Sequence, residues 1–536
     1  MEWLIGLWAL WSICRLLAWR FQEEQNTTHG AARWSTVWEV FKAGLFQEQG
    51  LRLGDWTGRL SVFFNGTHAL TIGSSGSSKG TSAVLPNLLS LKHILLVDPG
   101  GENTAVACKH WRDEGYHFSC INPFSMFEEA PWSLPAHGFN PFELIDANGS
   151  SLAADAKVIA EMLITRSAHE GGNTAYFKNA AAKSLSAMIV HIMSCEPVDR
   201  QNLATLYEYL NGTPAEWGEL LYAMQINTVC NGLVANAANE LQRIEAQSPS
   251  EFSGIRSSMA EGLDFLADPI VRENFKKNDV DFARLKGLEP NQKGAVISIV
   301  LPLEYLESHA AITRLALACT ILTIQRVPLA KHKLTFLIDE CAALGRLERF
   351  PNWLATLRKY NVSLWTIWQN VGQIVSLYGK NWQTIVGNCG VLQILGVGDL
   401  ETARFISSFI GQTTVKTVSY NQKKEQSQSF TARPLIAAEE LLQLDSTKQI
   451  VLMANLWPMI LEKTPYWCRP ELQGRYHPNP YYQGTTPKLS YQDTSAQARG
   501  NRYYSAVWWM APHPTAARIM GAPLLLFFLA VFFGGS

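Results

Sequence analysis

A glycine- and serine-rich loop with one lysine lies between a strand pattern and a helical pattern, and this order constrains the fold more than any other feature. The segment HALTIG ends at Gly73, the loop runs to Gly80, and TSAVLPNLLS follows with apolar residues at helical spacing. A strand, a loop and a helix in this order form the framework of a phosphate site. The sequence therefore predicts an α/β fold with a phosphate group at the amino end of a helix.

The loop follows the template G-x-x-x-x-G-K-[ST] with two departures. Gly73 and Lys79 are in register, whereas Ser78 replaces the second glycine and Gly80 replaces the hydroxyl residue that usually binds magnesium. In such a loop, backbone N–H groups surround the β-phosphate and the lysine neutralises the β- and γ-phosphates. Taken alone, a serine-rich turn explains the segment nearly as well. The predicted nucleotide-binding residues are Gly73, Ser74, Ser75, Gly76, Ser77, Ser78, Lys79, Gly80 and Thr81.

A second element lies far along the chain, where Asp339 and Glu340 end the segment LTFLIDE. This apolar run is typical of a buried parallel strand, and the acids after it form a Walker B arrangement. Such a run closed by two acids is frequent by chance. Combined with the loop, it predicts a site for ATP and Mg²⁺ in which Asp339 holds the hydrated metal and Glu340 polarises the attacking water.

Two further residues are weaker candidates for catalytic roles. Gln369 ends the strand pattern VSLWTIWQ, where its amide either senses the γ-phosphate or simply caps the strand. Arg358 lies in LATLRKY, a predicted helix before that strand. In a ring of subunits this arginine stabilises phosphate charge in a neighbouring site, and otherwise it belongs to a solvated helix face.

The patterns along the chain predict more than one domain, as the length of 536 residues also suggests. HILLVD is a further buried strand pattern that ends in an acid, and the polar segment from Thr417 to Arg433 is either a linker or an exposed hairpin. The predicted division is a membrane-anchor helix at 1–22, a nucleotide-binding domain in two parts at 30–175 and 288–475, an inserted all-α domain at 176–287, and a C-terminal extension with an apolar tail at 476–536.

Both ends of the chain are apolar. Residues 3–19 contain a single charge, Arg15, and form either a membrane helix or a buried amphipathic helix. Arg20 and Arg33 follow this segment, so the positive-inside rule places the bulk of the chain in the cytoplasm. The apolar tail at 519–533 is interrupted by Pro523 and is either a marginal anchor or a partner-binding segment.

The net charge of the chain excludes a global field that would draw it onto nucleic acid. Lys and Arg number 45 and Asp and Glu number 46, which gives a formal net charge of -1. Any contact with DNA must therefore be local.

Several blocks along residues 30–475 occur in the order found in one known family. They include GLRLGDWTGR, SSKGTSAVLPNLL, ILLVDPGGEN, FNPFELI, NTAYFKNAAAKSL, LIDECAALGRLE, WQNVGQIVSLYGKNWQTIVGNC and DLETARFISSFIGQTTV. Together they make the chain resemble the coupling proteins of type IV secretion and conjugation, in the TraG-like branch. The resemblance implies a RecA-like P-loop ATPase domain with an inserted all-α domain, assembled as a homo-hexamer at the bacterial inner membrane.

By position, the resemblance implies that Lys79 is the Walker A lysine, Asp339 and Glu340 are the Walker B acids, Gln369 is a sensor and Arg358 is an arginine finger. It also makes Gly80 a family trait, with Thr81 or Ser82 nearby to replace the missing hydroxyl. The implied partners are a relaxase–DNA complex or effector proteins, the components of the secretion channel, and single-stranded DNA as a further candidate.

The chain departs from the family pattern in three places. Ser78 stands where the family has glycine, and its Cβ crowds the loop if that residue needs a positive φ. Gly100 stands where the family has lysine, and the N-terminal apolar region is shorter than a pair of spans. Three hypotheses follow: a coupling ATPase that drives or gates export, a nucleotide-binding cargo receptor that does not cycle, and a DNA translocase of the chromosome-partitioning type.

Overall fold

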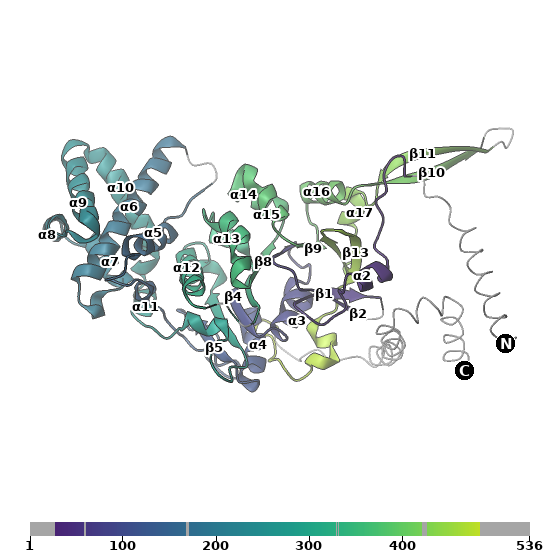
Figure 1. Ribbon diagram of the computed structural model, residues 1–536, viewed down its shortest axis with the longest axis horizontal. Helices are drawn as coiled ribbons and strands as arrows, with labels where there is room; N and C mark the ends of the chain where they lie inside the picture. The colour runs from purple at the N-terminus through teal and green to yellow at the C-terminus, as the bar shows by residue number, and fades with distance from the viewer. Residues whose placement is uncertain are drawn as a thin grey trace.

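One sheet of eleven strands forms the centre of the molecule (Figure 1). The computed structural model describes residues 27–57, 60–167, 171–328, 330, 332–420 and 426–482. The strands lie in the order β2-β1-β13-β12-β9-β3-β8-β7-β4-β6-β5. Strands adjacent in the sheet are often far apart in the chain, as crossover connections require.

Seven neighbouring strands are parallel, and they carry most of the buried apolar runs that the sequence predicts. The carboxyl ends of these strands meet at one edge of the sheet, where ligands of open α/β sheets collect. In sheet order they are β9 (Val391–Gly396), β3 (Ala69–Gly73), β8 (Val362–Trp368), β7 (Leu334–Ile338), β4 (His93–Pro99), β6 (Ala295–Leu301) and β5 (His117–Ile121).

The other four strands extend the sheet in antiparallel fashion, and they come from both ends of the described chain. They are β12 (Lys448–Met453), β13 (Leu456–Glu462), β1 (Leu51–Trp56) and β2 (Leu60–Phe64). A buried ion pair links β1 to the segment after β13, because Arg469 Nη2 lies 2.6 Å from Asp55 Oδ2. Breaking a buried pair of this kind usually costs about 3–5 kcal/mol, so this pair secures the C-terminal strands to β1.

Helices cover both faces of the sheet, and alternate residues of the strands point to two separate apolar clusters. Leu95 and Val97 of β4 pack in one cluster, whereas Ile94 and Leu96 pack in the other. The first face is covered by α12 (Ala310–Arg326), α13 (Phe350–Thr356), α14 (Val371–Tyr378), α15 (Trp382–Gly387), α16 (Leu400–Ile410) and α17 (Ala438–Leu442). The second is covered by α2 (Val37–Lys42), η1 (Lys79–Val84), α3 (Leu85–Leu88) and α4 (Glu102–Asp113).

The chain between β5 and β6 contains helices and no strand among its described residues, and most of these helices form a block at one end of the molecule (Figure 1). Its elements are α5 (Leu152–Leu163), α6 (Gly172–Cys195), α7 (Leu203–Asn211), α8 (Pro214–Gln225), α9 (Val229–Gln247), α10 (Pro249–Leu263) and α11 (Pro269–Asn274). Helices thus begin at Leu152, ahead of residue 176, and the division into domains stays a prediction.

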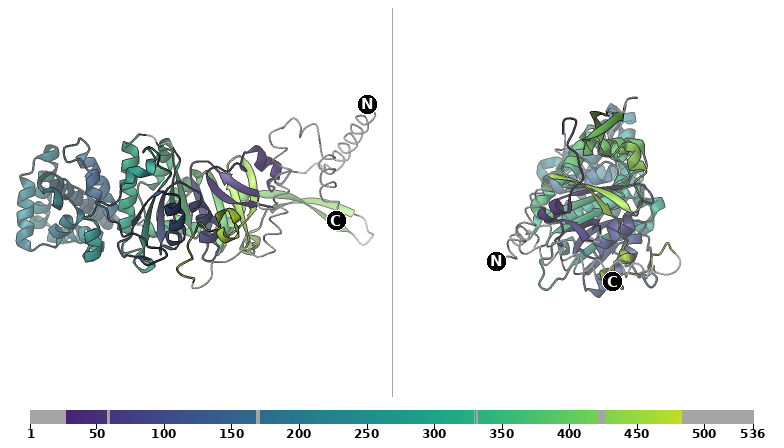
Figure 2. Two further views of the ribbon diagram at one scale, coloured as in Figure 1. Left: turned by 90° about the horizontal axis from the view of Figure 1, so that it is seen from below. Right: turned by 90° about the vertical axis from the view of Figure 1, so that its right-hand side faces the viewer.

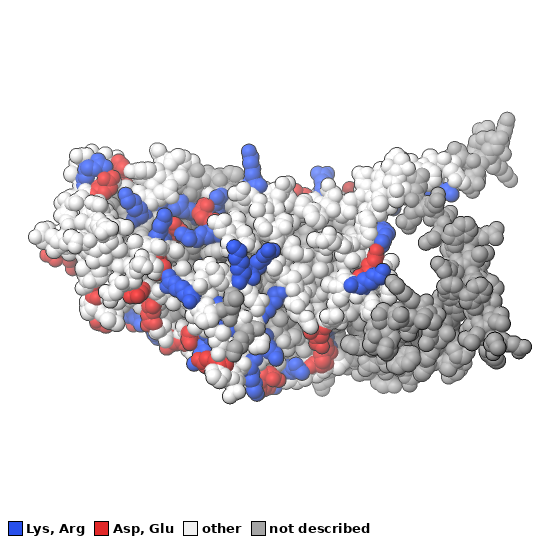
Figure 3. All heavy atoms as spheres, viewed as in Figure 1, with Lys and Arg blue, Asp and Glu red and all other residues white. Residues whose placement is uncertain are grey.

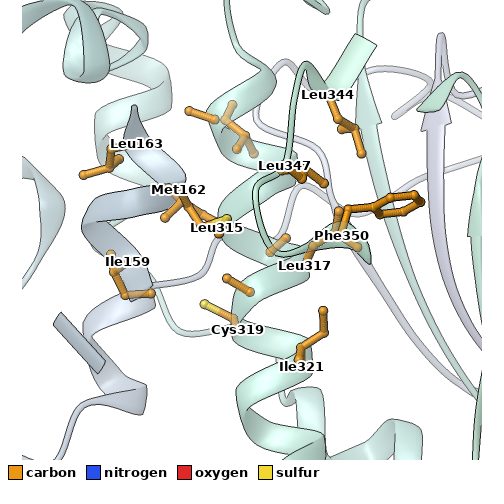
Figure 4. Packing of buried hydrophobic residues seen from close by; sticks show 14 of the residues in the cluster. Ile159, Met162, Leu163, Leu315, Leu317, Cys319, Ile321, Leu344, Leu347 and Phe350 are labelled. Atoms are coloured by element: carbon orange, nitrogen blue, oxygen red, sulfur yellow. The ribbon is translucent and has the colours of Figure 1, made fainter. Parts of the chain in front are cut away.

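Helix α5 joins this block to the sheet. Figure 4 shows Met162 of α5 beside Leu315 of α12, with Phe350 of the segment after β7 on the other side of α12. Arg349 of that segment also pairs with Glu161 of α5 at 2.8 Å. Because that segment begins at Asp339, the root of the helical block touches the chain that leaves the predicted site.

A two-stranded hairpin projects from the end of the molecule opposite the helical block (Figure 2). Its strands β10 (Gln412–Tyr420) and β11 (Gln426–Pro434) pair antiparallel over nine residues each. Of the two alternatives for the polar segment at Thr417 to Arg433, the hairpin is therefore correct. The start of the described chain lies at its base, where Ala31 forms a bridge with Thr413.

The predicted membrane helix at 1–22 and the apolar tail at 519–533 lie outside the described residues. Within the part of the chain that the structure describes, no helix combines the length and the low polarity that crossing a bilayer requires. On the face seen in Figure 3, basic and acidic side chains are interspersed over the helical block and the sheet body. This distribution agrees with the near-zero net charge.

Candidate functional site

The predicted phosphate loop leaves the carboxyl end of β3 and turns back into η1. Gly73 must be glycine here, because a Cβ on it would lie 2.6 Å from Ser77 Oγ and 2.9 Å from Lys79 Cγ. Gly76 has a φ of +76°, and no atom lies within 4 Å of its Cβ position. This part of the loop faces solvent. The loop is therefore a tight turn around its own lysine side chain.

Ser78 has a φ of +66° and a ψ of +30°, in the left-handed region. A residue with a Cβ is disfavoured there by about 1–2 kcal/mol, so the replacement of glycine at this position leaves the loop strained. The six residues after it, Lys79–Val84, form a wide π-helical turn rather than an α-helical start. Such turns are rare and are frequent at functional sites.

Two carboxylates lie side by side at the carboxyl edge, one after β7 and one at the end of β4. Val97 pairs with Ile338, so the next residues, Asp98 and Asp339, are neighbours. The Nδ2 atom of Asn103 donates to both acids, at 2.9 Å to Asp98 Oδ1 and 3.1 Å to Asp339 Oδ2. Thr104 N–H also donates to Asp98 Oδ2 at 2.6 Å.

This pairing changes the protonation of both acids. Burial raises the pKa of Asp98 to about 6. Burial, together with the charge of Asp98, raises the pKa of Asp339 to about 7, against the opposing effect of the Lys79 ammonium. Two close carboxylates titrate as a coupled pair, so the pair holds a proton near neutral pH when no cation is present.

Glu340 directly follows Asp339 and adopts a left-handed conformation with a φ of +77°. Two glutamine amides fix its carboxylate: Gln369 Nε2 donates to Oε2 at 2.8 Å, and Gln373 Nε2 lies 3.4 Å from Oε1. Strained backbone at an acid held by two donors is a common feature of functional sites. Gln369 is therefore more than a strand cap, since its side chain contacts the second acid.

The loop and the acids converge at Asn103. A Cβ on Gly80 would lie 3.3 Å from Asn103 Oδ1, and the other atom of the same amide contacts Asp339. The structure thus brings Lys79, Asp339, Glu340 and Gln369 to one edge of the sheet. Thr81 Oγ1 bonds to the Ser78 carbonyl at 3.3 Å, and the buried Ser82 Oγ has no hydrogen-bond partner among the described residues.

Arg358 does not join this group. It lies in the short 3-10 helix η8 (Leu357–Tyr360), which precedes β8, whereas Gln369 follows the carboxyl end of the same strand. The length of a seven-residue strand, roughly 20 Å, separates the two edges of the sheet. Arg358 is exposed to solvent, on the edge opposite its own chain's phosphate loop.

The sequence analysis did not identify Asp98, Asn103 or Gln373 as site residues. Asp98 could have been identified from the sequence, because it closes the strand pattern HILLVD in the same way that the two acids close LTFLIDE. For Asn103 and Gln373 no such signal exists, since their contacts depend on helix placement. Gly100, the departure next to Asp98, has a φ of +77° and accepts a hydrogen bond of 2.7 Å from the Tyr481 hydroxyl.

Comparison with known protein families identifies the family of this chain. The family described as Type IV secretory system Conjugative DNA transfer matches residues 23–493. The chain belongs to this family. The relatives in it include the conjugal transfer protein TraG of Agrobacterium fabrum, 24% identical over 451 residues and 77% of this chain. Another is the protein VirD4 of the same organism, 25% identical over 471 residues and 82% of this chain. The chain spans 63% and 66% of these two proteins, less than two thirds of their length.

Solved structures of the coupling protein TrwB share the fold of this family member. The unbound form of TrwB without its first 70 residues superposes with a TM-score of 0.58, at 15% identity, over 79% of this chain and 91% of that one. The complex of TrwB with ADP and Mg²⁺ gives a TM-score of 0.57 at 16% identity, over 81% and 93%. The α/β fold predicted from the strand and loop patterns is thereby confirmed, and the structure shows it as one large mixed sheet.

Proposed function

We propose that the chain is the coupling ATPase of a type IV secretion or conjugation system. In this proposal it binds ATP with Mg²⁺ and uses hydrolysis to drive or gate the export of relaxase–DNA complexes or effector proteins. The observation that carries the proposal is the meeting of Lys79, Asp339, Glu340 and Gln369 at one edge of the sheet.

The residues present fit a nucleotide with its metal. The loop from Ser74 to Lys79 offers backbone N–H groups and one ammonium to the phosphates. Asn103 Oδ1 is buried without a hydrogen-bond partner among the described residues, beside Gly80 and the two carboxylates. An amide oxygen is a suitable ligand for hydrated Mg²⁺, so Asn103 would hold the metal in place of the hydroxyl missing at Gly80. When bound, the metal neutralises charge on the β- and γ-phosphates.

The names of relatives support the role in export. A relative from Bartonella quintana, 24% identical over 434 residues, is named type IV secretion system-coupling protein VirD4. For this chain, the proposed partners are its exported cargo, the secretion channel and five further copies in a ring, at the inner membrane. The helical block is the proposed site of cargo recognition, because it projects from the sheet body at one end of the molecule (Figure 1).

Replacing Lys79 with alanine tests nucleotide binding. We expect the affinity for ATP with Mg²⁺ to fall at least about tenfold, because the loop loses its only ammonium facing the phosphates. Isothermal titration of the full chain measures this, with Lys157→Ala as a control that removes an exposed lysine of α5. Equal affinities of the native chain and Lys79→Ala would contradict the proposed site.

The raised pKa of Asp339 predicts a pH dependence of metal-assisted binding. A protonated acid cannot hold Mg²⁺, and the pKa of Asp339 near 7 means that the carboxylate forms as the pH rises. We expect the gain in nucleotide affinity on adding Mg²⁺ to increase between pH about 6 and about 8. Titrations with and without Mg²⁺ measure this gain, and in Asp339→Asn it should be small at every pH. A gain that is flat with pH in the native chain would refute the assignment.

Two departures from the family pattern favour a second function, that of a cargo receptor that binds nucleotide without cycling. Ser78 holds a left-handed conformation that glycine adopts without strain, and Gly100 lacks the charge that relatives are expected to carry. The first departure lies in the phosphate loop, and the second follows Asp98, with its Cβ position facing Leu303 and Tyr481. A receptor tolerates loss of the catalytic base, and a motor does not.

A further inference from the structure

A buried lysine from the antiparallel part of the sheet supports the phosphate loop. Lys463 follows β13, and its Nζ donates to the carbonyl of Ser77 at 3.2 Å and to the carbonyl of Leu395 at 2.8 Å. The residue is 9% exposed, and burial lowers the pKa of its ammonium, while the charge of Asp445 acts in the opposite direction. Its printed hydrogen bonds among the described residues go to carbonyls. A buried ammonium held by carbonyls is costly, so these contacts call for an explanation.

The sheet explains how a residue so late in the chain reaches the loop. Strand β13 is antiparallel to β12, and β12 is antiparallel to β9, so β13 runs in the direction of β9 and β3. Its carboxyl end therefore lies at the same edge as the phosphate loop. Lys463 approaches the loop from the buried side, beside Leu395 of β9.

The contact with Ser77 fixes the orientation of one peptide unit. A trans peptide is planar, so the N–H of Ser78 points opposite to the Ser77 carbonyl. Because the carbonyl points to the buried ammonium, this N–H points to the open side of the loop. That is the side from which backbone N–H groups of such a loop contact a phosphate.

A flip of this same peptide unit would relieve the backbone strain at Ser78. A flip of the unit between Ser77 and Ser78 would bring φ of Ser78 from +66° into the negative region that residues with a Cβ prefer. It would also point the carbonyl of Ser77 at the phosphate position. The serine at position 78 therefore favours the wrong orientation, and Lys463 opposes it.

We propose that Lys463 is a positioning residue that holds the Ser77–Ser78 peptide with its N–H toward the bound phosphate, against the strain that Ser78 introduces. The inference rests on the proposed function, since it assumes that the loop binds a nucleoside triphosphate. It deepens that function by assigning a role to a residue outside the nucleotide-binding motifs.

A double-mutant cycle tests the proposal by titrating the full chain with a non-hydrolysable ATP analogue and Mg²⁺. In Lys463→Met we expect at least about a tenfold loss of affinity, because the peptide is free to flip. In Lys463→Met combined with Ser78→Gly, at least half of that loss on a logarithmic scale should return, because glycine adopts the left-handed conformation without strain. Ser78→Gly alone should change the affinity far less.

Lys286→Met is the matched control. Lys286 is also a buried lysine bonded to two carbonyls, those of Val327 and Pro328, but its neighbour Gly287 packs on His93 at the amino end of β4. We expect this variant to lose thermal stability without losing affinity. The affinity of Lys463→Gln, whose shorter side chain keeps an amide donor group, should lie between those of the native chain and Lys463→Met, which makes it a milder variant.

The outcomes separate this proposal from the proposed function. Native binding together with unchanged affinity in Lys463→Met and Lys463→Gln overturns the role of Lys463 and leaves the nucleotide site intact. A loss in Lys463→Met that Ser78→Gly does not restore also overturns it, because a purely structural lysine would give that result. A native chain that does not bind the analogue overturns both proposals.

Discussion

Replacing Glu340 with glutamine is expected to lower the rate of ATP hydrolysis at saturating nucleotide by about 10²–10⁴-fold, with little change in nucleotide affinity. Glutamine keeps the size of the side chain but cannot accept a proton from the attacking water. The two amides of Gln369 and Gln373 that now fix the carboxylate remain in place, so the loop keeps its shape. Steady-state turnover and a separate binding titration distinguish the two effects.

The neighbouring acid Glu348 provides the control for this variant. It follows Glu340 in the same segment and pairs with Arg346 at 2.9 Å, with half of its side chain exposed. Glu348→Gln should leave turnover close to the native value. If Glu340→Gln supports native rates of cargo export, the chain acts as a receptor that does not cycle, and the motor hypothesis is wrong.

Replacing Arg358 with alanine is expected to have an equally large effect, a fall in turnover of about 10³–10⁵-fold. The reason is its place in the fold. A residue at the amino edge of the sheet cannot reach the phosphate loop of its own chain, so in the proposed ring its guanidinium would serve the site of a neighbouring copy. The neighbouring Lys359 is also exposed and lies in the same short helix, which makes Lys359→Ala the matched control.

Mixing two inactive variants tests the same assignment without relying on a single substitution. A Lys79→Ala chain retains Arg358, and an Arg358→Ala chain retains Lys79. If catalysis occurs between copies, a mixed assembly contains some complete sites and recovers part of the native turnover, although neither variant alone is active. Unchanged turnover in Arg358→Ala would show that this arginine is ordinary surface charge.

The strands that carry the site could be predicted because each is a short apolar run with a clear end. Strands β3, β4, β7 and β8 lie within one residue of HALTIG, HILLVD, LTFLID and VSLWTIWQ. Burial on both faces requires such runs in a parallel sheet, so pattern and position agree. The sequence analysis raised a positive φ of Ser78 only as a condition, and the structure shows that this condition holds.

Other parts of the site depend on contacts that a linear pattern does not contain. Lys463 reaches the loop because two antiparallel pairings bring the end of β13 to the carboxyl edge, and sequence spacing carries no trace of that topology. Asn103 is placed by the turn between β4 and α4. The segment around Arg358 was predicted as one helix, but it divides into α13 and a 3-10 turn that ends at Asn361 with a φ of +60°.

The position of β3 in the middle of the sheet also determines when the fold can be completed during synthesis. Leu70 pairs with Thr366 on one side and with Leu392 on the other, and the residues of the helical block are translated between them. At usual translation rates, β3 waits on the order of tens of seconds for its first neighbouring strand. A nascent chain therefore carries an apolar strand with two unpaired edges while the helices already fold, and such edges favour aggregation until β8 is made.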